Sequence, residues 1–124
     1  IQATDAKIIY VALAGSAMHS AANALGLRLA REGFADRQYD DDGNLASRSI
    51  PGTVIKDPAV AREQAIRMVR DGEVVSRHGK VIPVEVETLC VHGDEATGVA
   101  VAREVRRGLE EAGIAVLPLP ELID

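Results

Sequence analysis

The sequence is poor in aromatic residues and in cysteine, and both shortages narrow what the protein can be. It has no tryptophan, and its aromatic side chains are Tyr10, Phe34 and Tyr39. The core must therefore be aliphatic, and surfaces that stack nucleic-acid bases are not expected. Cys90 is the single cysteine, which excludes an internal disulfide bond and favours the reducing cytoplasm as the location.

Long apolar runs and clusters of basic residues are also missing. No apolar stretch approaches the roughly 20 residues of a membrane span, so no membrane partner is predicted. The formal net charge is −5, and Lys and Arg form no run, so no nucleic-acid partner is predicted either. What is present, 124 residues of which 47% are hydrophobic and 27% charged, is typical of one soluble globular domain over residues 1–124. Because the sequence enters a strand-like segment almost at once and lacks an initial Met, we expect further sequence before it.

The order of apolar patterns predicts alternating strands and helices. Short β-rich runs predict strands at 7–15, 33–37, 88–93 and 114–120. Helical spacing predicts helices at 16–33, 58–72 and 95–113. A polar loop is expected at 38–52 and a hairpin that turns at His78-Gly79 at 73–86. This order favours a parallel α/β architecture, either doubly wound or a barrel.

Two of these helices carry apolar stripes that should face the core. Asp57-Pro58 begins the second helix, with the aspartate as its cap and the proline in its first turn. The inner-facing residues are predicted to be Ala65, Met68 and Val69 in the second helix, and Ala102, Val105, Leu109 and Ala112 in the third.

The stretch CVHGDEATG, at 90–98, lies where a predicted strand ends and a helix begins. Functional sites of parallel α/β folds collect at such carboxyl ends. Alternation puts Leu89 and Val91 on one side of the strand and Thr88, Cys90 and His92 on the other, so that in a barrel His92 would lie at the mouth. His92 is then either a general acid or base, or a satisfied structural histidine. Asp94 is either a polar group of the site or the N-cap of the next helix.

Further candidates follow the other predicted strands. Arg37 and Arg48 could clamp a carboxylate or phosphate in bidentate fashion, or Asp36 and Arg37 could form an ion-pair network that orders the loop. Ser16, after the first strand, could help offer backbone N–H groups to an anion or could simply begin a turn. Walker, HExxH, paired-cysteine and Gly-x-Ser-x-Gly motifs are absent, and no metal ligands are assigned.

Three stretches, residues 33–58, 79–83 and 88–114, together with AGSAM before them, resemble the carboxyl-terminal half of LamB/YcsF family proteins. The combination of FADR-x-Y, the following G-x-L-x-x-R and CVHGD carries the resemblance. One departure is Glu95-Ala96-Thr97, where the family usually has a turn containing proline. The resemblance implies half of an incomplete (β/α) barrel of the glycoside hydrolase/deacetylase type. Because half a barrel leaves edge strands unpaired, we expect association with the amino-terminal half of the same protein, or a homo-oligomer.

The resemblance also implies an activity, the ATP-dependent opening of the cyclic amide 5-oxo-L-proline to L-glutamate. Other subunits of the 5-oxoprolinase complex would be partners, and ATP would be a co-substrate, plausibly with Mg²⁺. The roles then expected are general acid or base for His92, orientation of His92 or amide binding for Asp94, and anion binding beside His92 for Arg37. Substrate contacts are expected from Arg48, Tyr39, Asp36 and Ser16.

Two alternatives remain open at this point. The chain could be a non-catalytic binding or assembly subunit of that complex. By fold analogy alone, it could also be a metal-dependent hydrolase related to deacetylases. The catalytic interpretation depends on one geometric prediction, that His92 and Arg37 share a cavity.

Overall fold

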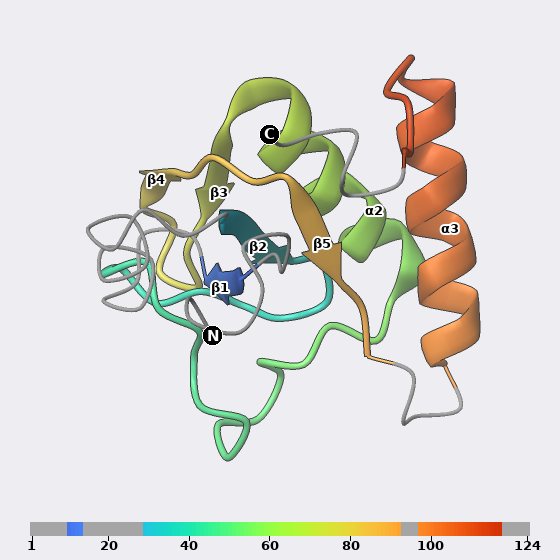
Figure 1. The fold of residues 1–124 in the computed structure, drawn as a ribbon. Helices are drawn as coiled ribbons and strands as arrows, with labels where there is room; N and C mark the ends of the chain where they lie inside the picture. The colour runs from blue at the N-terminus through green and yellow to red at the C-terminus, as the bar shows by residue number, and fades with distance from the viewer. Residues whose placement is uncertain (1–9, 14–28, 93–96, 118–124) are drawn as a thin grey trace.

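Parallel strands form the centre of the fold. The computed structural model describes residues 10–13, 29–92 and 97–117. Within them, β1 (Tyr10–Leu13), β2 (Leu29–Phe34) and β5 (Thr88–Cys90) make a parallel sheet in the order β1-β2-β5. The predicted α/β class with parallel strands is therefore confirmed, and Figure 1 shows the arrangement.

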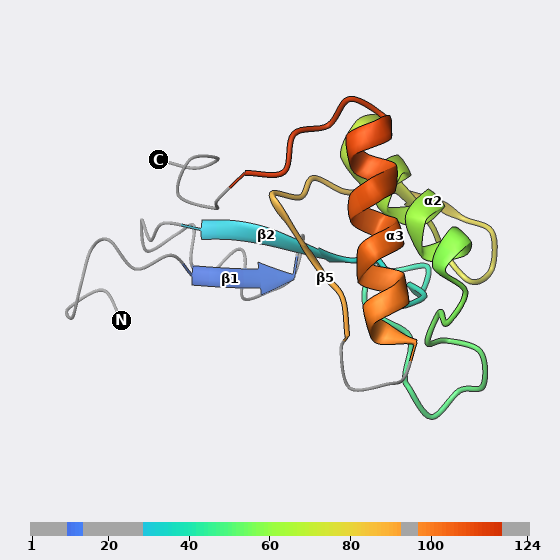
Figure 2. The ribbon, with the colours of Figure 1, turned by 90° about the vertical axis from the view of Figure 1, so that its right-hand side faces the viewer.

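Two helices pack side by side against this sheet. They are α2 (Pro58–Ile66), which continues through a π-helical segment η1 (Arg67–Asp71), and α3 (Gly98–Glu111). Figures 1 and 2 show both helices on the same side of the strands. The predicted start of α2 is confirmed, because the Asp57 carboxylate accepts a hydrogen bond from the Ala59 N–H at 3.0 Å and Pro58 occupies the first turn. Its continuation ends at Gly72, whose φ of 68° suits a residue without Cβ.

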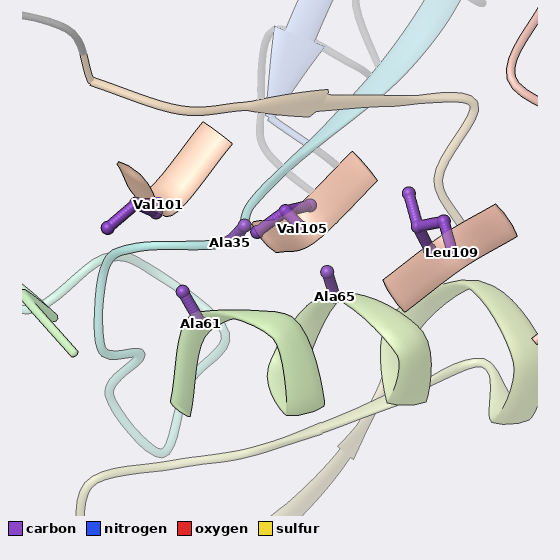
Figure 3. Close-up of a cluster of buried hydrophobic side chains, with 6 residues drawn as sticks. All are labelled: Ala35, Ala61, Ala65, Val101, Val105 and Leu109. Atoms are coloured by element: carbon purple, nitrogen blue, oxygen red, sulfur yellow. The ribbon is translucent and has the colours of Figure 1, made fainter. Parts of the chain in front are cut away.

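The core between α2 and α3 is built from small residues. Its buried members, drawn in Figure 3, are Ala35, Ala61, Ala65, Val101, Val105 and Leu109. Gly108 lies at the same contact, where an added Cβ would come within 2.2 Å of Arg62 Cγ. Small side chains at these positions allow the two helix axes to approach closely.

The predicted helix stripes need correction. Ala65 and Met68 are buried as expected, but Val69, Ala102 and Ala112 are exposed. The buried stripe of α3 runs instead through Gly98, Val101, Val105, Gly108 and Leu109. The error arose because alanine is a weak marker of burial. Glycine carries no hydrophobic signal at all, although Gly108 is required by the close contact of the two helices.

A second buried cluster joins the loop after β2 to the hairpin. Its members are Tyr39, Met68 and Val74. The hairpin consists of β3 (Glu73–Val75) and β4 (Val81–Pro83), which pair antiparallel around the turn predicted at His78-Gly79. Leu89 of β5 packs against both clusters, so the sheet connects the helices to the hairpin.

The strand β2 replaces the end of a predicted helix. Helical spacing placed residues 29–33 in a helix, whereas the structure pairs them with β1 and β5; residues 16–28 lie outside the described residues. Gly33, interpreted from the sequence as a helix stop, is instead a point of close approach, because an added Cβ would lie 2.9 Å from Val86 Cγ1 and 3.0 Å from Met68 Sδ. Pairing with two neighbouring strands outweighs a short local helical pattern.

The strand predicted at 114–120 is not formed over its described part, residues 114–117. Residues 114–117 have no strand pairing, and 118–120 lie outside the described residues. A strand needs a hydrogen-bonded neighbour, and none is placed beside 114–117 in the described part of the chain. None of the described helices combines the length and the apolar character needed to cross a membrane.

Candidate active site

Asp36 and His92 meet at the carboxyl ends of two neighbouring parallel strands. Asp36 follows β2 and His92 follows β5, and the pairing of these strands brings their ends together. One carboxylate oxygen of Asp36 accepts the His92 backbone N–H at 2.7 Å, and the other lies 2.9 Å from His92 Nδ1. Because an ionised carboxylate only accepts, this contact favours a proton on Nδ1, and in the neutral ring with that proton Nε2 is the nitrogen that carries the lone pair.

The imidazole is also fixed by packing. Its ring stacks on Phe34 with centroids 5.8 Å apart and planes inclined by 26°. Leu89 and Val91 pack against the helix cluster, as predicted for the apolar side of β5. Thr88, predicted on the polar side, instead lines a pocket together with Leu89 and Val91. The Asp36 side chain is 4% exposed and that of His92 is 22% exposed. The pair therefore combines a buried, oriented carboxylate with a partly accessible base.

Side chains from other elements hold the turn that carries Asp36. Gln64 of α2 donates from Nε2 to the carbonyl oxygens of Phe34 at 2.9 Å and Arg37 at 2.8 Å. The backbone N–H of Ile55 donates to the Asp36 carbonyl at 2.7 Å. Sequence analysis missed Gln64, because a glutamine on a helix carries no signal of its distant partners.

A small pocket adjoins the pair. Its lining includes Asp36, His92, Arg48 and Lys56 together with the amino-terminal end of α3 at Thr97-Gly98. Its volume of about 10 Å³ has room for roughly one water molecule. Two cationic side chains and the positive end of a helix dipole make the surroundings favourable for an anion. The prediction placed Arg48 at the site, whereas it missed Lys56.

Arg37 does not share this pocket, so the predicted cavity common to His92 and Arg37 is wrong. Successive residues of an extended chain point to opposite sides, and only Asp36 turns toward His92. The Arg37 side chain is instead buried under the following loop, where Nη2 donates to the Ala46 carbonyl at 2.7 Å. Its Nε has no hydrogen-bond partner among the described residues. The alternative of an Asp36–Arg37 ion pair is also wrong, because the partner of Asp36 is His92.

Tyr39 is a core residue in place of the predicted substrate contact. Its hydroxyl oxygen accepts the Phe34 backbone N–H at 2.9 Å, and its ring belongs to the cluster with Met68 and Val74. Burial raises the pKa of Tyr39 to about 12, so the hydroxyl stays protonated at neutral pH. Tyr39 thus supports the turn that carries Asp36.

Two predicted residues, Ser16 and Asp94, lie outside the described residues. The described helix α3 begins at Gly98 with Thr97 as its N-cap, three residues after the predicted start at 95. Among the described residues, the carboxylate that contacts the His92 ring is that of Asp36.

The described thiol and acidic groups near the strand ends do not gather into a set of metal ligands. Burial raises the pKa of the Cys90 thiol, which makes the reactive thiolate less available. Over the described ranges, no three side chains of His, Cys, Asp or Glu cluster closely enough to hold a metal ion.

Comparison with known proteins gives the family. The model of the LamB/YcsF family matches residues 1–124. The chain belongs to the LamB/YcsF family. This confirms the resemblance inferred from FADR-x-Y, G-x-L-x-x-R and CVHGD.

Similar family members carry one name. A protein of Rhodopseudomonas palustris named as the A subunit of 5-oxoprolinase is 51% identical over 118 residues, which is 95% of this chain and 46% of the relative. A Pyrococcus furiosus protein of the same name is 46% identical over 119 residues, covering 96% of this chain and 47% of the relative. The crystal structure of the lactam utilization protein from Thermus thermophilus is 40% identical with a TM-score of 0.84, over 93% of this chain and 45% of that chain. The chain thus spans about half the length of the relatives that it matches.

Proposed function

We propose that this chain provides the general base of a 5-oxoprolinase, which opens 5-oxo-L-proline to L-glutamate with hydrolysis of ATP. One observation carries the proposal: the Asp36–His92 pair lies at the carboxyl ends of adjacent parallel strands, in a chain about half identical to proteins named as the A subunit of 5-oxoprolinase. An oriented histidine whose Nε2 has no hydrogen bond to any of the described residues is suited to moving a proton to or from a reacting water at this position.

The ring opening requires proton transfers that the pair can perform. Water attacks the carbonyl carbon of the lactam while His92 Nε2 accepts the water proton. The Asp36 carboxylate stabilises the imidazolium that results. The ring C–N bond then breaks, and the proton passes to the departing nitrogen, which becomes the amine of glutamate. This ring opening consumes one water, and the histidine returns to its starting state.

The proposed ring opening requires ATP because the carbonyl carbon of an amide is a poor electrophile. Transfer of the terminal phosphoryl group to the lactam oxygen, with release of ADP, would make the carbonyl carbon more reactive. After water adds and the ring C–N bond breaks, the phosphoryl group remains on the new carboxyl group as an acyl phosphate, and a second water hydrolyses it to glutamate and inorganic phosphate. The substrate carboxylate and a phosphoryl group are both anions, and Arg48, Lys56 and the amino-terminal end of α3 surround the pocket beside His92. These groups support an anionic reactant at this place. Mg²⁺ would accompany the nucleotide as its counterion.

The proposed enzyme contains more than this chain. The chain spans about half of its relatives, and their name, which designates one lettered subunit, implies a complex of several subunits. We therefore include the amino-terminal half in the proposal, as the part that completes an incomplete (β/α) barrel, and other 5-oxoprolinase subunits as partners. Arg37, buried away from the pocket, has no part in the proposed proton transfer.

The test is a reconstituted reaction. The full-length protein that carries this chain, combined with its partner subunits, is expected to release glutamate from 5-oxoproline only with ATP. His92→Ala should reduce the rate by roughly 10²-fold or more, since general base catalysis contributes about that much. His78→Ala is the matched control, because His78 is exposed in the hairpin turn. A full rate in His92→Ala would remove this residue from the mechanism.

One observation favours a second function, that of a non-catalytic assembly subunit. The pocket beside the pair is no larger than a water molecule, so at that place the described residues leave no room for 5-oxoproline. Titration calorimetry on the full-length protein separates the two functions. An assembly subunit would be required for formation of the complex but would bind neither 5-oxoproline nor ATP.

A further inference from the structure

The backbone around Asp36 leaves the regular sheet just before the carboxylate. The last contact of this strand end with β5 is the hydrogen bond from the Ala35 N–H to the Cys90 carbonyl at 3.2 Å. From Asp36 onward, the backbone hydrogen bonds that fix the conformation of the chain come from residues outside β5. The carbonyl of Asp36 itself receives the Ile55 N–H, which leaves the carbonyls on either side of it to be satisfied.

Gln64 satisfies carbonyls on both sides of Asp36 with one amide group. Its Nε2 donates to Phe34 O at 2.9 Å, two residues before Asp36, and to Arg37 O at 2.8 Å, one residue after it. A longer contact of 3.5 Å reaches the Ala35 carbonyl between them, so the two N–H groups of the amide face the three carbonyls that flank that of Asp36. A single planar group bonded to two carbonyls fixes the distance between them, and with it the backbone conformation of the residues that they enclose.

We infer that Gln64 is a positioning residue: it holds the turn that aims the Asp36 carboxylate at His92. This inference rests on the proposed function of the Asp36–His92 pair. Gln64 can act in this way because its own helix is fixed, since Ala61 and Ala65 on the same helix are fully buried against α3. The position of the carboxylate is thus set by the helix layer and not by the loop alone.

The two contacts between Asp36 and His92, at 2.7 and 2.9 Å, leave little tolerance for a shift of the turn. Without Gln64, two carbonyls would seek water or new donors, and the turn would relax. Displacement of a catalytic group by about 1 Å costs on the order of 10²-fold in rate. Gln64 does not line the described pocket beside His92, so KM should change little while kcat falls.

The test is Gln64→Met in the full-length protein reconstituted with its partner subunits. Methionine matches the length of glutamine but donates no hydrogen bond. We expect kcat to fall roughly 10- to 100-fold with KM within about twofold, and the population of the His92 Nδ1–H tautomer, measured by long-range ¹H–¹⁵N correlation NMR, to fall with it. Glu63→Met, on the exposed side of the same helix, should leave all three quantities unchanged.

Two results would overturn the inference. One is an unchanged tautomer population and kcat in Gln64→Met, and the other is a lower kcat with the native tautomer population. If Gln64→Met does not fold, Gln64→Asn takes its place, because an amide one methylene shorter cannot reach both carbonyls. The tautomer measurement does not depend on catalysis, so it separates this inference from the proposed function, whose failure would appear as a full rate in His92→Ala.

Discussion

The two ends of the β2–β5 pair are closed by the same kind of contact. Near the amino-terminal end, the Glu87 carboxylate accepts the backbone N–H of Arg31 at 3.0 Å and its Nε–H at 2.9 Å. At the carboxyl end, the Asp36 carboxylate accepts the backbone N–H of His92 and faces its Nδ1. In each case a carboxylate next to one strand contacts both the backbone N–H and a side-chain nitrogen of a single residue in or next to the other strand.

The two residues held by these carboxylates, Arg31 and His92, differ in whether a nitrogen lone pair is available for chemistry. Arg31 is permanently charged, its pKa is raised further by the hydrogen bond to Glu87, and Nη1 pairs with Glu85 at 2.9 Å. It has no lone pair for chemistry. His92 keeps a lone pair on Nε2 beside a pocket lined by cations. A buried carboxylate that binds backbone and side chain of one residue stabilises the strand pair at both ends. Whether the site can also be reactive depends on the residue that the carboxylate binds.

The strongest way to break this comparison is to neutralise each carboxylate in turn. We expect Asp36→Asn to lower the rate of glutamate release by roughly 10²-fold or more, because an amide cannot stabilise the imidazolium and does not enforce the Nδ1–H tautomer. The matched variant Glu87→Gln should keep the rate within about twofold and instead lower the free energy of unfolding in urea by about 1–3 kcal/mol. An equal loss of activity in both variants would contradict a purely structural role for the Arg31–Glu87 end.

The stability of the amino-terminal clamp can be isolated by a double-mutant cycle. Arg31→Met should lower the free energy of unfolding by about 2–3 kcal/mol, because it leaves the Glu87 carboxylate, only 13% exposed, without its charged partner. Combined with Glu87→Gln, the coupling energy should lie between about 0.5 and 3 kcal/mol. Glu85→Gln is the control; its side chain is 77% exposed, and a change within about 0.5 kcal/mol is expected.

A substitution at Gly33 tests whether the close packing of β2 against Val86 contributes to stability. Gly33→Ala should lower the free energy of unfolding by about 1–3 kcal/mol, because the new Cβ would lie 2.9 Å from Val86 Cγ1. Adding Val86→Ala makes room for it, so the double variant should be more stable than the sum of the two single changes. Additive losses in chemical denaturation would show that the steric contact is not the cause.

The last prediction concerns how the titration of Tyr39 affects the free energy of unfolding. This contribution does not change with pH near neutrality and changes only at alkaline pH. Burial raises its pKa in the folded protein to about 12, above its ordinary value of 10.0, so the folded state binds the phenolic proton more tightly than the unfolded state. The contribution to stability is complete below pH 10 and is lost as the pH rises from 10 through 12. Tyr39→Phe should therefore show a flatter decline of unfolding free energy over this range. Parallel declines in the two proteins would contradict the burial of this hydroxyl.

Part of this structure could be predicted from the sequence, because some signals are local. Asp57 and Pro58 mark a helix start through contacts within one turn, and the alternation along β5 places Leu89 and Val91 on its apolar side. The motifs around Asp36 and His92 also pointed to the family. Each of these inferences needs only residues that are neighbours along the chain.

Other features depend on residues far apart in the sequence. The pairing of Asp36 with His92 spans 56 positions, and the bonds of Gln64 to the turn span 27 and 30. No local pattern shows that Arg37, next to Asp36, turns away and is buried. The same is true of β2, where pairing with two strands outweighed a helical pattern.

The sequence by itself determined the family, the α/β class and the presence of a histidine at a strand end, because periodicity and motif spacing are properties of the chain. Only the tertiary structure decided which carboxylate holds that histidine and which arginine lies beside it. The physical reason is that hydrogen bonds act over about 3 Å in space. Which groups come within that distance is set by the pairing of β2 with β5 and by the packing of α2 against α3.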